Sequence, residues 1–247
     1  MADSRFPTAI ADRVAEVSLA VGKVNALSID AALALADHIE GLGRSPDLAV
    51  VILRNEGDSF CAGADVKEIS ADPSRIGESN RAWLRLARAC HQCELPVIAA
   101  VDGHCIGGGI VLAASCDMLI LSDRSSFSLP QIRTGGWGAG TYLMRLLGPL
   151  KIRAAMFTAR TLTAAEIAAG GQIEAVLPRE ALREAARSLA RDIGQYSAEA
   201  IRAGKAALNG IELLDLEESY RFEHAFTTEL FTSPQATARR RQQLPKS

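Results

Sequence analysis

Two glycine-containing turns carry the residues with the clearest potential for chemistry. They occupy residues 61–65 (CAGAD) and 105–109 (CIGGG), and each follows an apolar segment and opens a predicted helix. The first turn of a helix presents backbone N–H groups without acceptors in the helix, together with the positive end of the helix dipole. Two such turns side by side could hold one oxyanion, such as an enolate oxygen. The alternative is that the glycines only let a strand turn tightly into a helix.

Several common catalytic signatures are absent from the sequence. We find no Gly-x-x-x-x-Gly-Lys-Ser/Thr, no Gly-x-Gly-x-x-Gly, no Gly-x-Ser-x-Gly and no His-x-x-x-His pair that contains a glutamate. Their absence argues against a nucleotide-phosphate loop, a Rossmann site, a hydrolase nucleophile elbow and a zinc-protease site.

Short apolar strands must position the two turns. Val17, Leu19 and Val21 alternate with smaller residues, which predicts a half-buried strand, and Ser28 is a predicted helix N-cap after it. A continuous apolar run at 48–53 predicts a second strand. The other predicted strands are residues 97–101, 118–121, 127–129 and 173–177.

Helices connect these strands and dominate after residue 135. Thr163 and Glu166 have the spacing of a capping box. Because no linker composition interrupts the chain, we predict an α/β core over residues 1–194 and a helical region over 195–247. The predicted helices cover residues 29–42, 66–70, 75–93, 110–115, 139–147, 150–159, 164–169, 179–194, 198–209 and 212–231.

Composition excludes several classes of protein. The 247 residues are 48% hydrophobic, and 27 basic side chains nearly balance 29 acidic ones. A disordered chain would be less apolar, and a protein that binds nucleic acid would carry a basic excess. No apolar run reaches the roughly 18 residues of a membrane span and the amino terminus has no signal-peptide pattern, so we expect a cytoplasmic protein. The cysteines lack the two spaced pairs of a zinc site, so we expect buried thiols and no metal.

The two turns and their flanks together resemble the crotonase (enoyl-CoA hydratase/isomerase) superfamily. The similarity spans about residues 14–209 and extends more loosely to the end of the chain. The matching segments are NALS (25–28), SFCAGADVKE (59–68), PVIAAVDG (96–103), GGG (107–109), CD (116–117), FSLP (127–130) and LTAAE (162–166).

The resemblance implies a fold, an assembly and a ligand. The fold would be a spiral of ββα repeats with a helical C-terminal trimerisation region, and the assembly a homo-trimer or hexamer. The ligand would be a coenzyme A thioester, bound as substrate and without another cofactor. The resemblance places two oxyanion-hole N–H groups on Ala62 and Gly108. It places the contacts to coenzyme A near Lys23, Val24, Ala26, Ala64, Asp65 and Val66.

The chain departs from the family at the two positions that matter most for hydration. Hydratases of this family use two glutamates as acid and base on water, and Val111 and Gln131 stand at those positions here. General acid–base groups each contribute about 10²- to 10⁴-fold to a rate. We therefore expect an acyl-CoA enzyme that stabilises a thioester enolate and hydrates poorly. A non-catalytic acyl-CoA carrier is the alternative from a different functional class.

Three further residues have two interpretations each. His104 could titrate near the site or serve as a hydrogen-bonded loop histidine. Trp137 could shape a pocket for a flat or cyclic acyl group, as could Trp83, or pack in the core. Lys23 could pair with a coenzyme A phosphate or lie exposed.

The carboxyl-terminal sequence shows a second, weaker similarity. Segments AALN (206–209), SYR (219–221) and FTTEL (226–230) are similar to actinobacterial crotonase homologues that open steroid rings. Those homologues carry a glutamate where this chain has Gln131. A ring-opening C–C hydrolase acting on a cyclic acyl-CoA is thus a further alternative.

Overall fold

A six-stranded sheet runs through the molecule. The computed structural model describes residues 3–211 and, beyond them, residues 215–218, 220, 221, 224, 228, 232, 234, 237, 238 and 241. The strand order is β1-β2-β4-β7-β9-β12, and every pair except β1 with β2 is parallel. The strands are β1 (Thr8–Ala11), β2 (Val14–Leu19), β4 (Val50–Asn55), β7 (Val97–Val101), β9 (Met118–Ser122) and β12 (Ala175–Leu177).

Two smaller sheets connect the first sheet to the glycine turns. One has the order β11-β10-β8-β5 and the other pairs β3 with β6. The sequence did not predict β5, β6 or β8, because each has only two or three residues. Their bounds are β3 (Ala26–Leu27), β5 (Ser59–Cys61), β6 (Gly63–Ala64), β8 (His104–Ile106), β10 (Ser126–Ser128) and β11 (Leu162–Thr163).

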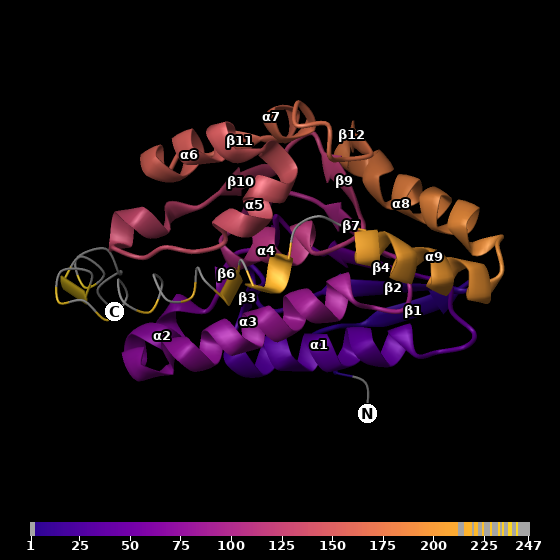
Figure 1. Ribbon diagram of the computed structural model, residues 1–247, viewed down its shortest axis with the longest axis horizontal. Coiled ribbons are helices and arrows are strands. Elements are labelled where there is room, and N and C mark those ends of the chain that lie inside the picture. The colour runs from indigo at the N-terminus through magenta and orange to yellow at the C-terminus, as the bar shows by residue number, and fades with distance from the viewer. Residues whose placement is uncertain are drawn as a thin grey trace.

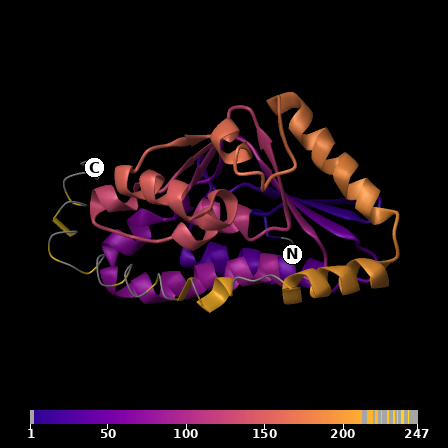
Figure 2. The same cartoon turned by 45° about the horizontal axis from the view of Figure 1, so that its top comes forward.

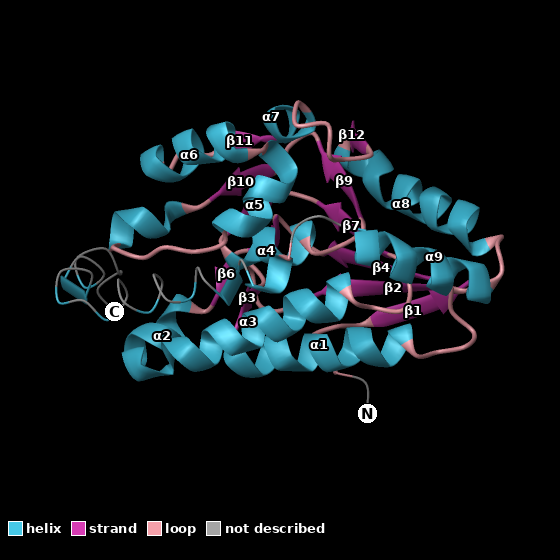
Figure 3. Ribbon diagram, viewed as in Figure 1, coloured by secondary structure: helices cyan, strands magenta, loops and turns pink. Residues whose placement is uncertain are grey.

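Helices enclose the strands on both sides (Figures 1 and 3). The helices α1 (Ile29–Gly43) and α3 (Ile76–His91) pack side by side, and α8 (Arg179–Gly194) packs on the large sheet. No helix among the described residues is both long and apolar enough to cross a membrane. The remaining helices are α2 (Val66–Ala71), α4 (Gly108–Ala114), α5 (Gly140–Leu147), α6 (Pro149–Thr158), α7 (Ala164–Ala168) and α9 (Ala198–Ile211), with 3-10 turns at Pro73–Arg75 and Pro130–Thr134.

This arrangement is the predicted mixed α/β fold, and the predicted bounds agree closely for the longest elements. Ser28 caps α1 as expected, accepting a hydrogen bond from the Ala31 N–H at 3.1 Å. The expected packing of the cysteines as small hydrophobes is confirmed, because all five are buried.

The prediction of a half-buried first strand is wrong, because all six residues of β2 are buried. Its polar residue Glu16 lies under α8, where Arg183 and Arg187 bond to the carboxylate at 2.7 Å and 2.6 Å and Arg54 bonds to it from β4. Burial alone would raise the pKa of Glu16, but these arginines lower it. A charge alternating with apolar residues therefore marks an ion-pair network here and not a solvent-exposed face.

The helix α9 packs on the body of the same chain, against the C-terminal end of α3 (Figure 2). Its Lys205 is 4% exposed and bonds to Asp117 at 2.6 Å, and to the carbonyl oxygens of Cys90 and Leu95 at 3.1 Å and 3.2 Å. The helix predicted over 212–231 lies mostly outside the described residues. The division at residue 194 and the trimer or hexamer stay predictions.

Candidate functional site

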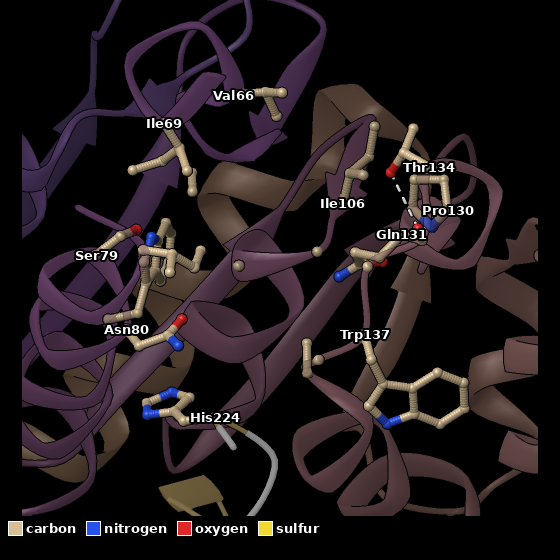
Figure 4. A pocket seen from close by; sticks show the side chains of 18 of the residues that line it. Val66, Ile69, Ser79, Asn80, Ile106, Pro130, Gln131, Thr134, Trp137 and His224 are labelled. Carbon is tan, nitrogen blue, oxygen red and sulfur yellow. Dashed lines mark hydrogen bonds between the residues drawn. The ribbon is translucent and has the colours of Figure 1, made fainter. Parts of the chain in front are cut away.

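A cavity of about 460 Å³ opens between β6, the first turn of α4, α3 and the segment 130–139. Its walls are mainly apolar and include Ile69, Trp83, Ile106 and Trp137. Polar groups enter from different elements, as Figure 4 shows: Asn80 and His224 lie on one side and Gln131 on the other. A largely apolar cavity with a few convergent polar groups is typical of a small-molecule site.

The two glycine turns meet at this cavity. A Cβ atom added to Gly63 would lie 2.8 Å from the Gly108 nitrogen and 2.8 Å from the Ile106 oxygen, so the two backbones are in direct contact. Ala62, Ala64, Gly107 and Gly108 all line the cavity. Gly108 opens α4, so its N–H has no acceptor within the helix.

The prediction that Ala62 supplies a free N–H donor is wrong. The Ala62 N–H donates to the Val24 carbonyl oxygen at 3.0 Å, beside the β3–β6 ladder. Leu27 pairs with Ala64 in that ladder, and its carbonyl oxygen accepts from the Asp65 N–H at 2.9 Å. In a parallel ladder, such pairing turns the N–H of Ala64 toward the opposite edge. Ala64 and Gly108, which both line the cavity, are therefore the candidates for the two N–H donors of an oxyanion site.

Packing requires glycine at all three positions of the triplet. Gly107 has a φ of +54°, which disfavours L side chains. A Cβ on Gly108 would lie 2.7 Å from the Trp83 ring, and a Cβ on Gly109 would lie 2.1 Å from the Cys61 carbonyl oxygen. The glycines thus permit the tight turn, as one interpretation held, and they also bring the two turns into contact, as an oxyanion site would require.

Gly109→Ala should destabilise the fold by about 1–3 kcal/mol, because the added methyl group pushes α4 away from the carbonyl oxygen of β5. Urea unfolding measures the change. Gly41→Ala is the matched control: Gly41 lies in α1 with nothing within 4 Å of an added Cβ, so alanine should stabilise the protein by about 0.5–1 kcal/mol. Equal effects of the two substitutions would contradict the packing described here.

The two positions that distinguish this chain from hydratases have different surroundings. Val111 is fully buried in α4 and does not line the cavity, so it is a core residue and not part of the site. Gln131 lines the cavity, and its Oε1 is buried without a hydrogen-bond partner among the described residues. No aspartate or glutamate lies among the described residues that line the cavity.

Both tryptophans lie on the cavity wall. Trp83 is 4% exposed, and Trp137 packs against Phe157 with ring centroids 5.8 Å apart. Of the two interpretations of Trp137, the structure favours the one in which its ring shapes a pocket.

The other predicted residues lie at or beyond the mouth. Val66 lines the cavity and is 51% exposed, and Lys23 and Val24 are exposed on the loop before β3, which contains Ala26. Asp65 caps α2 by accepting from the Lys67 N–H at 2.9 Å. His104 does not line the cavity: it is exposed at the start of β8, and its Nδ1 bonds to Ser126 at 2.8 Å. It is thus the hydrogen-bonded histidine of the second interpretation, although it lies in a strand and not in a loop.

Sequence reasoning missed His224. This half-buried residue reaches the cavity from the C-terminal segment, and its Nε2 has no hydrogen-bond partner among the described residues. Its neighbours in sequence form no catalytic motif, so the only available signal was a histidine within a predicted helix.

Comparison with known proteins identifies the family. The enoyl-CoA hydratase/isomerase family model matches residues 9–244. A (7aS)-7a-methyl-1,5-dioxo-2,3,5,6,7,7a-hexahydro-1H-indene-carboxyl-CoA hydrolase from Mycobacterium tuberculosis is 41% identical over 84% of this chain and 85% of that protein. The protein of the same name from Rhodococcus jostii is 38% identical over 89% of this chain and 86% of that protein.

Hydratases are also similar. A probable enoyl-CoA hydratase from Mycobacterium bovis is 34% identical over 83% of each chain. The crystal structure of a probable enoyl-CoA hydratase from Mycobacterium thermoresistibile has a TM-score of 0.84 at 26% identity, covering 92% of this chain and 94% of that one. The contact between two glycine turns, the α/β fold and these similarities agree: the chain belongs to the enoyl-CoA hydratase/isomerase family of the crotonase superfamily.

Proposed function

We propose that this enzyme opens a ring of a cyclic β-oxo acyl-CoA by hydrolysis, through a thioester enolate. The observation that carries this proposal is a largely apolar cavity at which the two glycine turns meet, with a lining free of carboxylates among the described residues. Hydration by the family's route uses glutamates at the positions of Val111 and Gln131, whereas ring opening needs one base from any part of the site and fixed donors for the enolate oxygen. The relatives named as hydrolases, at 38% and 41% identity, act on a bicyclic dioxo acyl-CoA by name.

The reaction uses the described groups as follows. Water adds to the ring ketone carbon that lies β to the thioester carbonyl, and a base accepts one water proton. The bond between this carbon and the α-carbon then breaks. Its electron pair forms the thioester enolate, whose oxygen accepts from the Ala64 and Gly108 N–H groups, and the former ketone carbon becomes a carboxyl group. Protonation of the α-carbon completes the step, with coenzyme A still attached.

The dimensions and lining of the cavity support a cyclic acyl group. Its volume of about 460 Å³ is within the range of pockets for ligands of this size. Trp83 and Trp137 offer flat apolar surfaces to a ring. Exposed Lys23 and Val24, with the half-buried Ala26, are proposed to contact the coenzyme A portion, since Val24 bonds directly to the turn that contains Ala62.

A comparison of thioesters tests the proposal. Purified enzyme should convert 2-oxocyclohexanecarboxyl-CoA, a cyclic β-oxo probe, at least 100-fold faster in kcat/KM than it hydrates crotonyl-CoA, since the cavity lacks the hydratase carboxylates. Liquid chromatography with mass spectrometry follows both reactions. Rapid hydration of crotonyl-CoA would contradict this proposal and identify the enzyme as a hydratase. Tight binding of all thioesters without turnover would identify a carrier.

A further inference from the structure

We propose that His224 is the proton-transfer residue of this site, accepting the proton of the attacking water and returning it to the α-carbon. The inference rests on the proposed ring opening, which needs a base that the family's glutamate positions do not supply here. The other described residues of the cavity present amides, hydroxyl groups and the guanidinium of Arg133, none of which accepts a proton at neutral pH.

Unpartnered polar atoms point to this residue. Within the described parts of the chain, three buried side-chain atoms lack a hydrogen-bond partner: Ser70 Oγ, Gln131 Oε1 and His224 Nε2. Two of them belong to Gln131 and His224, residues that line the same cavity from opposite sides (Figure 4). Buried polar atoms are nearly always paired in folded proteins, so two unpaired atoms on residues of one cavity wall indicate groups that a bound ligand satisfies.

The imidazole is held in place by packing. Its ring makes an edge contact with Tyr220 at a centroid distance of 4.3 Å, and Tyr220 makes a second edge contact with Tyr142 of α5 at 5.2 Å. Asn80 of α3 bonds to Thr228 at 3.5 Å, one helical turn beyond His224. Tyr220 thus packs directly on the ring, and contacts from α5 and α3 hold residues on either side of His224, whose Nε2 keeps no partner among the described residues.

Burial keeps this histidine neutral. It lowers the pKa of His224 from 6.5 to about 4, with no opposing charge among its causes. Among the described residues, the other charged or titratable groups that line the cavity are Arg133, which bonds to the Ala159 carbonyl oxygen at 2.7 Å, and Tyr220. A neutral imidazole accepts a proton, and negative charge developing on the thioester oxygen then stabilises the imidazolium. Gln131 is placed to orient the water through its free carbonyl oxygen.

His224→Asn should lower kcat for 2-oxocyclohexanecarboxyl-CoA about 100-fold with KM nearly unchanged, because asparagine keeps a polar group but transfers no proton. The matched control is His38→Asn: His38 also has a pKa lowered by burial, bonds to Thr8 and lies outside the cavity. It should retain wild-type kcat. Imidazole in the buffer should restore part of the activity of His224→Ala. A kcat of His224→Asn within threefold of wild type would overturn the inference.

The acid limb of the pH profile provides a second readout. Since the pKa of His224 is about 4, wild-type kcat/KM should be constant near neutrality and fall as pH drops toward 4, where the imidazole becomes protonated. The slow residual activity of His224→Asn should lack this limb. An identical limb in both proteins would contradict the assignment.

A binding measurement separates failure of this inference from failure of the proposed function. The four histidines give separate ¹⁵N signals that single His→Asn variants assign. Saturating cyclohexanecarboxyl-CoA, which has no ketone to hydrolyse, should shift the His224 signal and leave that of His38. This result would support the location of His224 in the acyl site even if ring opening were absent. An unmoved His224 signal with bound ligand would overturn the inference even if ring opening occurred.

Discussion

Gly108→Ala should lower kcat for the cyclic β-oxo probe by about 100- to 1,000-fold, the effect of losing one oxyanion donor. The added Cβ would lie 2.7 Å from the Trp83 ring, so either α4 or the ring must move. Movement of α4 shifts the Gly108 N–H relative to the Ala64 N–H, so the two groups can no longer donate to the same enolate oxygen. Steady-state kinetics measures the loss, and circular dichroism with size-exclusion chromatography checks that the variant is folded.

A double variant assigns this loss to the contact with Trp83. Trp83→Phe removes part of the indole ring that the new methyl group would strike. The penalty of alanine at 108 should therefore be smaller in the Trp83→Phe background than in wild type. The same penalty in both backgrounds, or an active Gly108→Ala enzyme, would contradict the described arrangement of α4 over α3.

Lys205→Ala should destabilise the protein by about 3 kcal/mol, because it removes one partner of a buried ion pair. The Lys205 side chain is 3% exposed, and its Nζ lies 2.6 Å from Asp117 Oδ2, which also accepts from the Val97 N–H at 2.7 Å. The pair joins α9 to the beginnings of β7 and β9. Urea denaturation should show a lower midpoint with an unchanged slope.

Lys205→Met is the control for the aliphatic part of the side chain. Methionine fills similar space without charge. The difference in unfolding free energy between Lys205→Ala and Lys205→Met therefore measures the packing of the aliphatic part. The loss of stability in Lys205→Met measures the lost polar contacts. Asp117→Asn combined with Lys205→Met should cost less than the sum of the single changes. Additive costs would show that the two residues do not interact.

The elements with strong local signals could be predicted from the sequence. The strand predicted over 97–101 coincides with β7, and the helix predicted over 179–194 coincides with α8. Both have an uninterrupted period and clear boundaries. The strands β5 and β8 were missed, because three-residue strands that lead into glycine turns resemble loops and exist only through their pairing with each other.

The candidate site was predictable only in part. The glycine turns, Gln131 and Trp137 stand in recognisable sequence positions, and the structure brings all of them to one cavity. The donor at Ala62 was assigned wrongly, because the β3–β6 register decides which N–H faces the cavity. His224 reaches the cavity from a segment distant in sequence, which is positioned by the packing of Tyr220 on Tyr142. The local sequence pattern around His224 contains no information about such long-range contacts.

Oxygen labelling tests the central claim most directly. Enzyme, 2-oxocyclohexanecarboxyl-CoA and H₂¹⁸O should yield an open-chain product that retains coenzyme A and carries one ¹⁸O in the new carboxyl group distal to the thioester. Mass spectrometry of the intact thioester and its fragments locates the label. Release of free coenzyme A with ¹⁸O in the cyclic acid would show thioester hydrolysis and contradict the account. So would an unchanged cyclic thioester in a preparation that hydrates crotonyl-CoA rapidly.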